Sequence, residues 1–192
     1  RGIREAETIL GEAASQPQPG ITVYEQLPDP QPAGTFKAAP LGVIFHGSRS
    51  GKAGNPLDAE YRGTANYAVN NPLGLGWNAT VGPGRVSIHL DARHWGHNAR
   101  AASDKYVGVE IAQPTVNDPL PDSVPTALAD YIFDHVWPVW GELWHFPSHA
   151  ELEAWGETGQ RDGKTDLYPT GDERMNAFRQ KVYDRLNVRK GA

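Results

Sequence analysis

Cysteine is absent from all 192 residues, so the fold carries no disulfide bond and any bound metal must be held by histidine or carboxylate side chains. No apolar run approaches the length of a membrane span, which argues against stable membrane insertion. The formal net charge is −5 and the basic residues are scattered, so the chain lacks the basic stripe of a nucleic-acid-binding protein. Residues 1–20 also lack the basic-then-apolar layout of a signal peptide.

The composition is that of a folded protein, with 39% hydrophobic and 21% charged residues. Two proline-rich stretches, 16–20 and 28–34, predict an N-terminal extension over residues 1–40 that partly wraps a single domain spanning residues 41–192. Within the extension, residues 3–14 favour a short helix and residues 21–27 alternate like an edge strand.

From residue 41 onward, strand and helix patterns alternate irregularly. Buried or half-buried strands are predicted at 41–45, at 106–113 and in a hairpin over 77–90 that turns at Gly82-Pro83-Gly84. These patterns favour an α/β domain with a mixed sheet flanked by helices.

Three segments have helical patterns, the first of them around residues 59–67. A second starts at residue 123, carries Leu128, Ile132 and Val136 on one face, and is expected to end at Pro138. A third covers residues 171–187. There Thr170 and Glu173 have capping-box spacing, and the apolar stripe is Met175, Phe178, Val182 and Leu186.

His46 stands where the first of these strands meets a polar, glycine-rich loop. A lone histidine at a strand end is more often a hydrogen-bonded structural residue than a ligand. Ligand and catalytic side chains nevertheless concentrate where a rigid element meets a loop. His46 alone leaves both interpretations open.

Glu110 interrupts the apolar strand at 106–113. Val109 and Ile111 point to the opposite face, so Glu110 shares its face with Gly108 and Ala112, which are small enough to leave room for substrate or water. A buried carboxylate is costly unless it is paired or lies beside a metal. An edge strand with Glu110 in solvent is the alternative, and we favour a functional role.

Other polar segments have a weaker signal. The stretch 149–166 ends in Asp-Gly-Lys-Thr-Asp, which taken alone is typical of a solvated turn. His94 and His97 have a spacing that suits a metal, but Gly96 makes a helix there doubtful, so this segment fits the rim of a cleft better.

Taken in order, these segments resemble the zinc-dependent N-acetylmuramoyl-L-alanine amidases, the family of phage amidase lysozymes and peptidoglycan recognition proteins. GVIFHGS (42–48) is similar to the family's strand that ends in a ligand histidine, and GWNATVGPGRVSIHL (76–90) to its hairpin. HWGHNARAASDKYVGVEIAQ (94–113) is similar to its loop and acidic catalytic strand. PSHAELEAWGETGQRDGKTDLYP (147–169) supplies a second histidine and then Lys-x-Asp.

The resemblance covers residues 41–187 and implies a single α/β domain with one catalytic Zn²⁺ ion. It implies His46, His149 and Asp166 as metal ligands, Glu110 as general base and Lys164 as oxyanion stabiliser. Substrate contacts are expected from Trp77, Asn78, Trp95 and His97.

The implied reaction is hydrolysis of the amide bond between N-acetylmuramic acid and L-alanine in bacterial peptidoglycan. The protein would then act on the bacterial cell wall as a phage lysin, a periplasmic enzyme or a secreted one. The second interpretation is a recognition module of the same fold that binds peptidoglycan without cutting it. Such modules typically lose a metal ligand, whereas a complete set can be assigned here.

Two departures from the family pattern stand out. His149 and Asp166 are 17 positions apart, which is longer than expected and leaves His145 as a competing ligand. Many phage members carry a tyrosine on the first hairpin strand, whereas this chain has Trp77, which has no phenol to donate or titrate.

Overall fold

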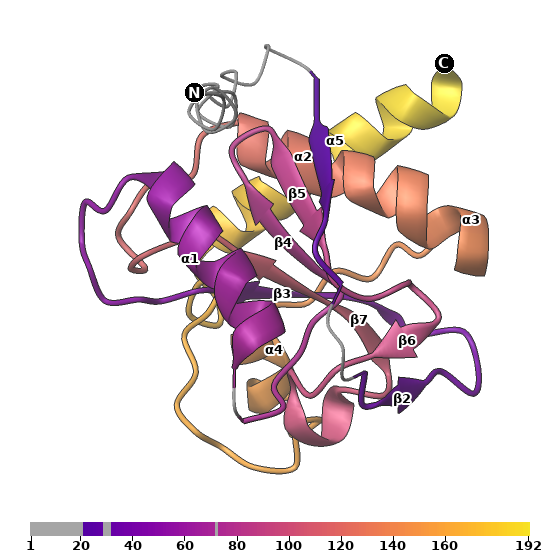
Figure 1. The fold of residues 1–192 in the computed structure, drawn as a ribbon, viewed down its shortest axis with the longest axis horizontal. Helices are drawn as coiled ribbons and strands as arrows, with labels where there is room; N and C mark the ends of the chain where they lie inside the picture. The colour runs from indigo at the N-terminus through magenta and orange to yellow at the C-terminus, as the bar shows by residue number, and fades with distance from the viewer. Residues whose placement is uncertain (1–20, 29–31, 72) are drawn as a thin grey trace, which may run out of the picture.

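The structure, a computed structural model, describes residues 21–28, 32–71 and 73–192 (Figure 1). The helix expected at 3–14 lies outside the described residues. The five-stranded central sheet has the order β1-β5-β4-β7-β3. Its strands are β1 (Val23–Gln26), β3 (Gly42–Gly47), β4 (Ala79–Gly82), β5 (Arg85–Ile88) and β7 (Tyr106–Ile111).

The sheet is mixed, as the sequence predicted. β4 and β5 are antiparallel, and every other neighbouring pair is parallel. The hairpin turns at Pro83 and Gly84, and Gly84 has a φ of 65°, which a type II turn requires of its third residue. A second, two-stranded sheet pairs β2 (Gly34–Thr35) with β6 (His94–Trp95).

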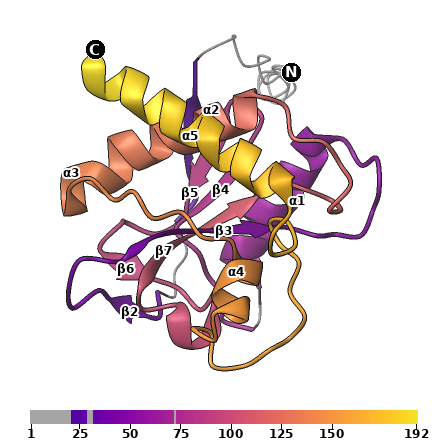
Figure 2. The ribbon, with the colours of Figure 1, turned by 180° about the vertical axis from the view of Figure 1, so that it is seen from behind.

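Helices cover both faces of the central sheet, as comparison of Figures 1 and 2 shows. Helix α1 packs on one face and helices α2 and α5 on the other, while α4 lies beside β3. The helices are α1 (Leu57–Asn70), α2 (Ser123–Tyr131), α3 (Trp137–Trp140), α4 (His149–Ala154) and α5 (Glu173–Gly191), with a 3₁₀ turn η1 (Arg100–Ala102) and a π-helical segment η2 (Ile132–Val136).

The two faces of the sheet differ chemically. The face toward α2 and α5 is apolar and is buried in one cluster with the predicted helix stripes. Its members include Phe45 on β3, whose ring lies 5.9 Å from that of Phe178 on α5. Because side chains alternate along a strand, the next residue, His46, points to the opposite face, on the side of α1.

The predicted edge strand is confirmed as β1, which pairs in parallel with β5. Two side chains near the start of β1 bond to the helices behind the sheet. The Thr22 hydroxyl donates to Asp130 on α2 at 2.7 Å, and the Tyr24 hydroxyl donates to Asp134 on η2 at 2.8 Å. The described part of the N-terminal extension therefore completes the sheet. A division of the chain at residue 40 stays a prediction.

Pro138 does not end its helix, contrary to the sequence prediction. The chain passes from α2 through the π-helical segment η2 into α3, and it ends at Gly141 with a φ of 78°. Pro138 falls in the first turn of α3, where the missing N–H is not needed, and the widened π-helical turn precedes it.

The expected capping box of Thr170 and Glu173 is also wrong. Asp172 caps α5 by accepting from the backbone N–H of Arg174 at 2.9 Å, and the Thr170 hydroxyl donates instead to the Ala150 carbonyl at 3.0 Å.

Among the described residues, no helix is long and apolar enough to cross a bilayer.

Substitution of Gly42 tests how closely the segment 145–147 packs against β3. The segment 145–147 runs along its outer edge, where Val43 donates to the His145 carbonyl at 3.0 Å and Phe45 to the Pro147 carbonyl at 2.9 Å. A Cβ at Gly42 would overlap the His145 carbonyl. We expect Gly42→Ala to lower the free energy of unfolding by about 1–3 kcal/mol, measured by urea denaturation.

Gly63→Ala is the control for this change. A Cβ at Gly63, in the middle of α1, meets no atom within 4 Å, so the better helix propensity of alanine should stabilise the protein by about 0.5–1 kcal/mol. Equal effects of the two substitutions would contradict the proposed overlap.

Candidate functional site

Strand register places His46 beside Glu110. β3 and β7 are parallel, and His46 pairs with Glu110, which in turn pairs with Thr80 on β4. Both His46 and Glu110 lie one residue before the carboxyl end of their strands. Open α/β sheets bind their ligands at that edge, so the register alone brings a basic and an acidic side chain to the expected place.

His149 is the first residue of α4, and a capping box fixes where that helix begins. The Ser148 hydroxyl accepts from the Glu151 N–H at 3.2 Å, and the Glu151 carboxylate accepts from the Ser148 N–H at 2.8 Å. Arg179 on α5 donates to the same carboxylate at 2.6 Å. His149 is therefore presented from a rigid helix start, buried beside β3.

Asp166 reaches the site from a long loop that is fixed at several points. The Asp166 carbonyl accepts from the Ala150 N–H at 2.9 Å. The buried Glu153 carboxylate accepts from the Lys164 N–H at 2.7 Å and also from the Asp162 N–H. These bonds explain how 17 positions can separate His149 from Asp166 while their side chains meet.

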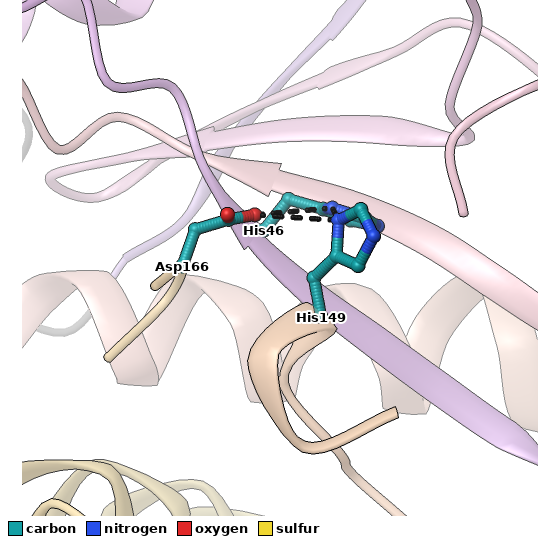
Figure 3. A group of neighbouring side chains, drawn as sticks. All are labelled: His46, His149 and Asp166. Carbon is teal, nitrogen blue, oxygen red and sulfur yellow. Dashed lines mark hydrogen bonds and ion pairs between the residues drawn. The ribbon is translucent and has the colours of Figure 1, made fainter. Parts of the chain in front are cut away.

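His46, His149 and Asp166 converge in Figure 3 from a strand, a helix start and a loop. The two Nδ1 atoms lie 3.1 Å apart, and Asp166 Oδ2 lies 3.4 Å from that of His46 and 3.6 Å from that of His149. All three residues are buried. Among the described residues, this is the group of His, Asp and Glu side chains whose geometry fits a metal ion.

The spacing of these three atoms suits a tetrahedral ion. Ligands about 2.0–2.1 Å from a tetrahedral zinc are separated by roughly 3.3 Å, close to the three distances found here. Two neutral imidazoles and one carboxylate also match the usual donor set of a catalytic zinc site, which leaves a fourth position open. The donors therefore fit zinc.

The charge states of His46 and Asp166 agree with this role. Burial lowers the pKa of His46, although Asp166 partly opposes the shift, so its imidazole is neutral near pH 7. Burial alone would raise the pKa of Asp166, but hydrogen bonds with His149 and His46 outweigh it and hold that pKa well below its usual range. Neutral imidazole and ionised carboxylate are the forms that bind metal.

The pKa of Glu110 is shifted in the opposite direction from that of Asp166. Burial, together with the nearby Asp166 charge, raises its pKa to about 8, while Lys164 and Arg49 work against this rise. A carboxyl group with a pKa near the working pH can accept and release a proton readily, as a general base and acid must.

A cleft of about 970 Å³ opens over these groups, between the sheet edge, α1 and the loop that carries Asp166. Glu110, Lys164, Trp77 and His97 all line it together with the three candidate ligands. Its size is sufficient for a substrate much larger than a single sugar or amino acid.

Several solved structures share this architecture. The Staphylococcus aureus hydrolase AmiA matches with a TM-score of 0.57 and 11% identity, over 89% of this chain and 86% of that one. A mutant endolysin from Bacillus subtilis matches with a TM-score of 0.56 and 15% identity, over 84% and 99%. PlyL matches with a TM-score of 0.57 and 14% identity, over 84% and 96%.

The chain has the amidase fold. The resemblance that the sequence motifs indicated is thereby confirmed at the level of the fold, including the single α/β domain with a mixed sheet. No protein-family model matches the sequence, and no curated protein matches it either.

Within the amidase fold, the structure places His149 rather than His145 beside His46. The His145 side chain is exposed, and its ring lies 6.0 Å from that of Trp155, outside the cleft. Its backbone carbonyl is the atom that matters to the fold, because it accepts from Val43 at 3.0 Å.

Two of the four expected substrate contacts lie elsewhere. Asn78 is fully buried, and its amide is occupied by the His94 carbonyl at 2.8 Å and the Gly108 N–H at 3.0 Å, so it is structural. Trp95 packs against Gly34 in the small sheet and lines a different hollow. Asn78 and Trp95 were expected to face the substrate, but both lie where β6 packs against neighbouring segments.

Trp77 and His97 do line the cleft. The Trp77 indole N–H donates to Thr80 at 2.8 Å, and its ring stacks with that of Tyr67 at 6.4 Å. Trp77 is buried at 6% exposure and forms part of the cleft wall beneath Tyr67, which is 44% exposed.

The space beside Glu110 is not open over Gly108, contrary to the expectation. A Cβ at Gly108 would overlap the side chain of Asn98, which fills that position and lines the cleft. A larger residue at position 108 would overlap Asn98, so the absence of a side chain there makes room for Asn98 and not for substrate.

The sequence interpretation missed several charged residues of the cleft, among them Arg49 and Glu60. The Glu60 carboxylate accepts from Ser48 at 2.5 Å, from Ser50 at 2.7 Å and from Asn55 at 2.9 Å, which holds the loop after His46 against α1. No periodicity marks Glu60, whereas a cation directly after the His46 strand was a readable signal for Arg49. The S-x-x-E pattern of Ser148 and Glu151 would likewise have indicated a helix start at His149.

The raised pKa of Glu110 predicts a pH-dependent stability in the metal-free protein. The folded state keeps a proton up to about pH 8 that the unfolded state loses near 4.5, so this contribution to stability is full below 4.5 and is lost as pH rises through 8. We expect Glu110→Gln to match the wild type in acid. Above pH 8 its free energy of unfolding should be higher by roughly 2–4 kcal/mol.

Urea denaturation in the presence of a chelator, at several pH values across this range, measures the difference. Parallel stability profiles for the two proteins would show that Glu110 is not the group responsible.

Proposed function

We propose that this protein is a zinc-dependent N-acetylmuramoyl-L-alanine amidase that acts on peptidoglycan of the bacterial cell wall. The observation that carries the proposal is the three-donor group of His46, His149 and Asp166 with Glu110 on the adjacent strand, all in one cleft. The fold supports it, since the similar structures include a hydrolase and an endolysin.

In this proposal His46, His149 and Asp166 hold the metal ion. A bound zinc ion supplies Lewis-acid polarisation of the scissile carbonyl and lowers the pKa of water. Glu110 takes the proton of the attacking water as the new C–O bond forms, then passes it to the L-alanine nitrogen as the C–N bond breaks. Lys164, on the wall of the cleft, donates to the developing oxyanion.

The cleft lining combines aromatic and polar side chains, which suits a substrate with a sugar part and a peptide part. Tyr67, exposed and stacked on the buried Trp77, offers a ring of the kind that contacts sugars and peptides. The cleft is also lined by the serines and charges of the loop after His46. Together with His97 on the rim, these surfaces support a substrate that extends on both sides of the cut bond.

Metal binding tests the ligand assignment. Zinc should raise the melting temperature of the wild type, because binding to the folded state alone stabilises it by about 4 kcal/mol at a thousand-fold excess over Kd. His149→Ala and Asp166→Ala should abolish this rise and the stoichiometric zinc content. His145→Ala is the matched control and should keep both, since its side chain lies outside the cleft. Loss of zinc from the His145 variant alone would refute the assignment.

Digestion of purified peptidoglycan tests the reaction. New L-alanine amino termini should appear with the isolated protein, disappear on chelation and return with zinc. Glu110→Gln should lower the rate by about 10²–10⁴-fold, as loss of a general base does, without lowering zinc content.

Glu142→Gln is the control for that variant, because Glu142 is exposed, pairs with Lys190 at 2.8 Å and lies away from the cleft. Zinc binding with peptidoglycan retention but no release would instead support a recognition module. Neither retention nor release would reject peptidoglycan as the ligand.

A further inference from the structure

Arg49 joins two parts of the candidate metal site. It lies three residues after His46, and its Nη2 atom donates to the carbonyl oxygens of Thr165, at 3.0 Å, and of Leu167. These two carbonyls flank Asp166 on either side. One nitrogen of the guanidinium thus holds the backbone on both sides of a candidate ligand.

The backbone of Arg49 is itself fixed to the sheet. Ser48 donates to the Ile111 carbonyl at 2.9 Å and Arg49 to the Gln113 carbonyl at 3.0 Å, which extends the ladder between β3 and β7. Arg49 has a φ of 51°, in the left-handed region that a non-glycine residue occupies only where its surroundings demand it.

The guanidinium lies against β3, where Gly47 leaves it space. A Cβ at Gly47 would come within 3.4 Å of Arg49 Nε. Nε and Nη1 are buried and have no hydrogen-bond partner among the described residues. The two carbonyls beside Asp166 are therefore the contacts that orient this side chain.

We propose that Arg49 is a positioning residue for the metal centre, which clamps the Asp166 loop to the strand of His46. The inference rests on the proposed function in one respect, namely that the distance between these donors matters because a metal is bound there. In this role Arg49 acts through the backbone carbonyls on either side of Asp166 and not through the donor atoms themselves.

The other bonds of the loop do not make this connection. Glu153 holds the loop to α4, and the Asp166 carbonyl bonds to Ala150, also on α4. Arg100 pairs with Asp162 at 2.5 Å and ties the loop to η1. The two contacts with α4 fix Asp166 relative to His149, whereas Arg49 fixes it relative to His46.

Arg49 could affect zinc binding through its charge or through its hydrogen bonds to the Asp166 loop, and the two mechanisms predict opposite changes in zinc affinity when Arg49 is replaced. A guanidinium close to a dication repels it, so losing the charge alone would strengthen zinc binding. Losing the clamp would weaken zinc binding, because changes in groups that orient metal ligands typically reduce affinity 10–100-fold. The sign of the change separates the two.

The experiment measures zinc Kd by competition with a chelator for the wild type, Arg49→Met and Arg49→Lys. We expect Kd to be 10–100-fold higher in Arg49→Met. Arg49→Lys keeps the charge but has a shorter reach, and its Kd should also rise. Arg93→Met is the matched control. Arg93 is exposed and pairs with Asp91, so the zinc Kd of this variant should equal that of the wild type.

Amide hydrogen exchange at residues 163–168 in the zinc-free proteins gives a second readout that does not depend on the proposed function. Faster exchange there in both Arg49 variants, and not in Arg93→Met, is expected of a clamp. Unchanged exchange, or a Kd in Arg49→Met equal to or lower than that of the wild type, would overturn the inference. A wild type that binds no zinc would refute the proposed function, while the exchange rates would still decide whether Arg49 holds the loop.

Discussion

Three lone-pair donors that face one another in a buried space repel unless a proton or a cation lies among them. His46, His149 and Asp166 are held in that arrangement, with their donor atoms 3.1–3.6 Å apart. Nothing in chain connectivity brings them together, since they come from a strand, a helix start and a loop. The surrounding hydrogen bonds keep three separate backbones in place, so that the donor atoms stay within reach of one shared proton or cation, and the site depends on that constraint.

Much of the fold and part of the site could be predicted from the sequence, because the informative residues lie on regular elements. His46 and Glu110 sit on strands whose alternation indicates which face each occupies, and the β3–β7 register then makes them neighbours. The choice between His145 and His149 could not be made in that way. It depends on the capping box of Ser148 and Glu151, and on a loop whose path no periodicity describes.

The failures have a common physical origin. Asn78 and Trp95 are polar or amphipathic residues near turns, which suggested exposure, but tertiary packing of the hairpin against β6 buries the one and directs the other away from the cleft. Arg49 acts through hydrogen bonds to a segment far along the chain, whereas Glu60 accepts from Ser48, Ser50 and Asn55, which lie 5 to 12 positions before it. The sequence shows a cation soon after the His46 strand, but the carbonyls that Arg49 reaches are fixed only when the chain is folded.

The same strands serve stability and chemistry on opposite faces. Phe45 packs into the apolar layer with α5, while the adjacent His46 faces the cleft, and Val109 and Glu110 divide in the same way on β7. Burial of the apolar face offsets the cost of crowding titratable groups on the other. Because neighbouring residues point to opposite faces, the polar face can change while the layer against α2 and α5 stays intact. Changes in the polar face should therefore alter metal and proton affinity more than they alter folding, whereas changes one residue away should do the reverse.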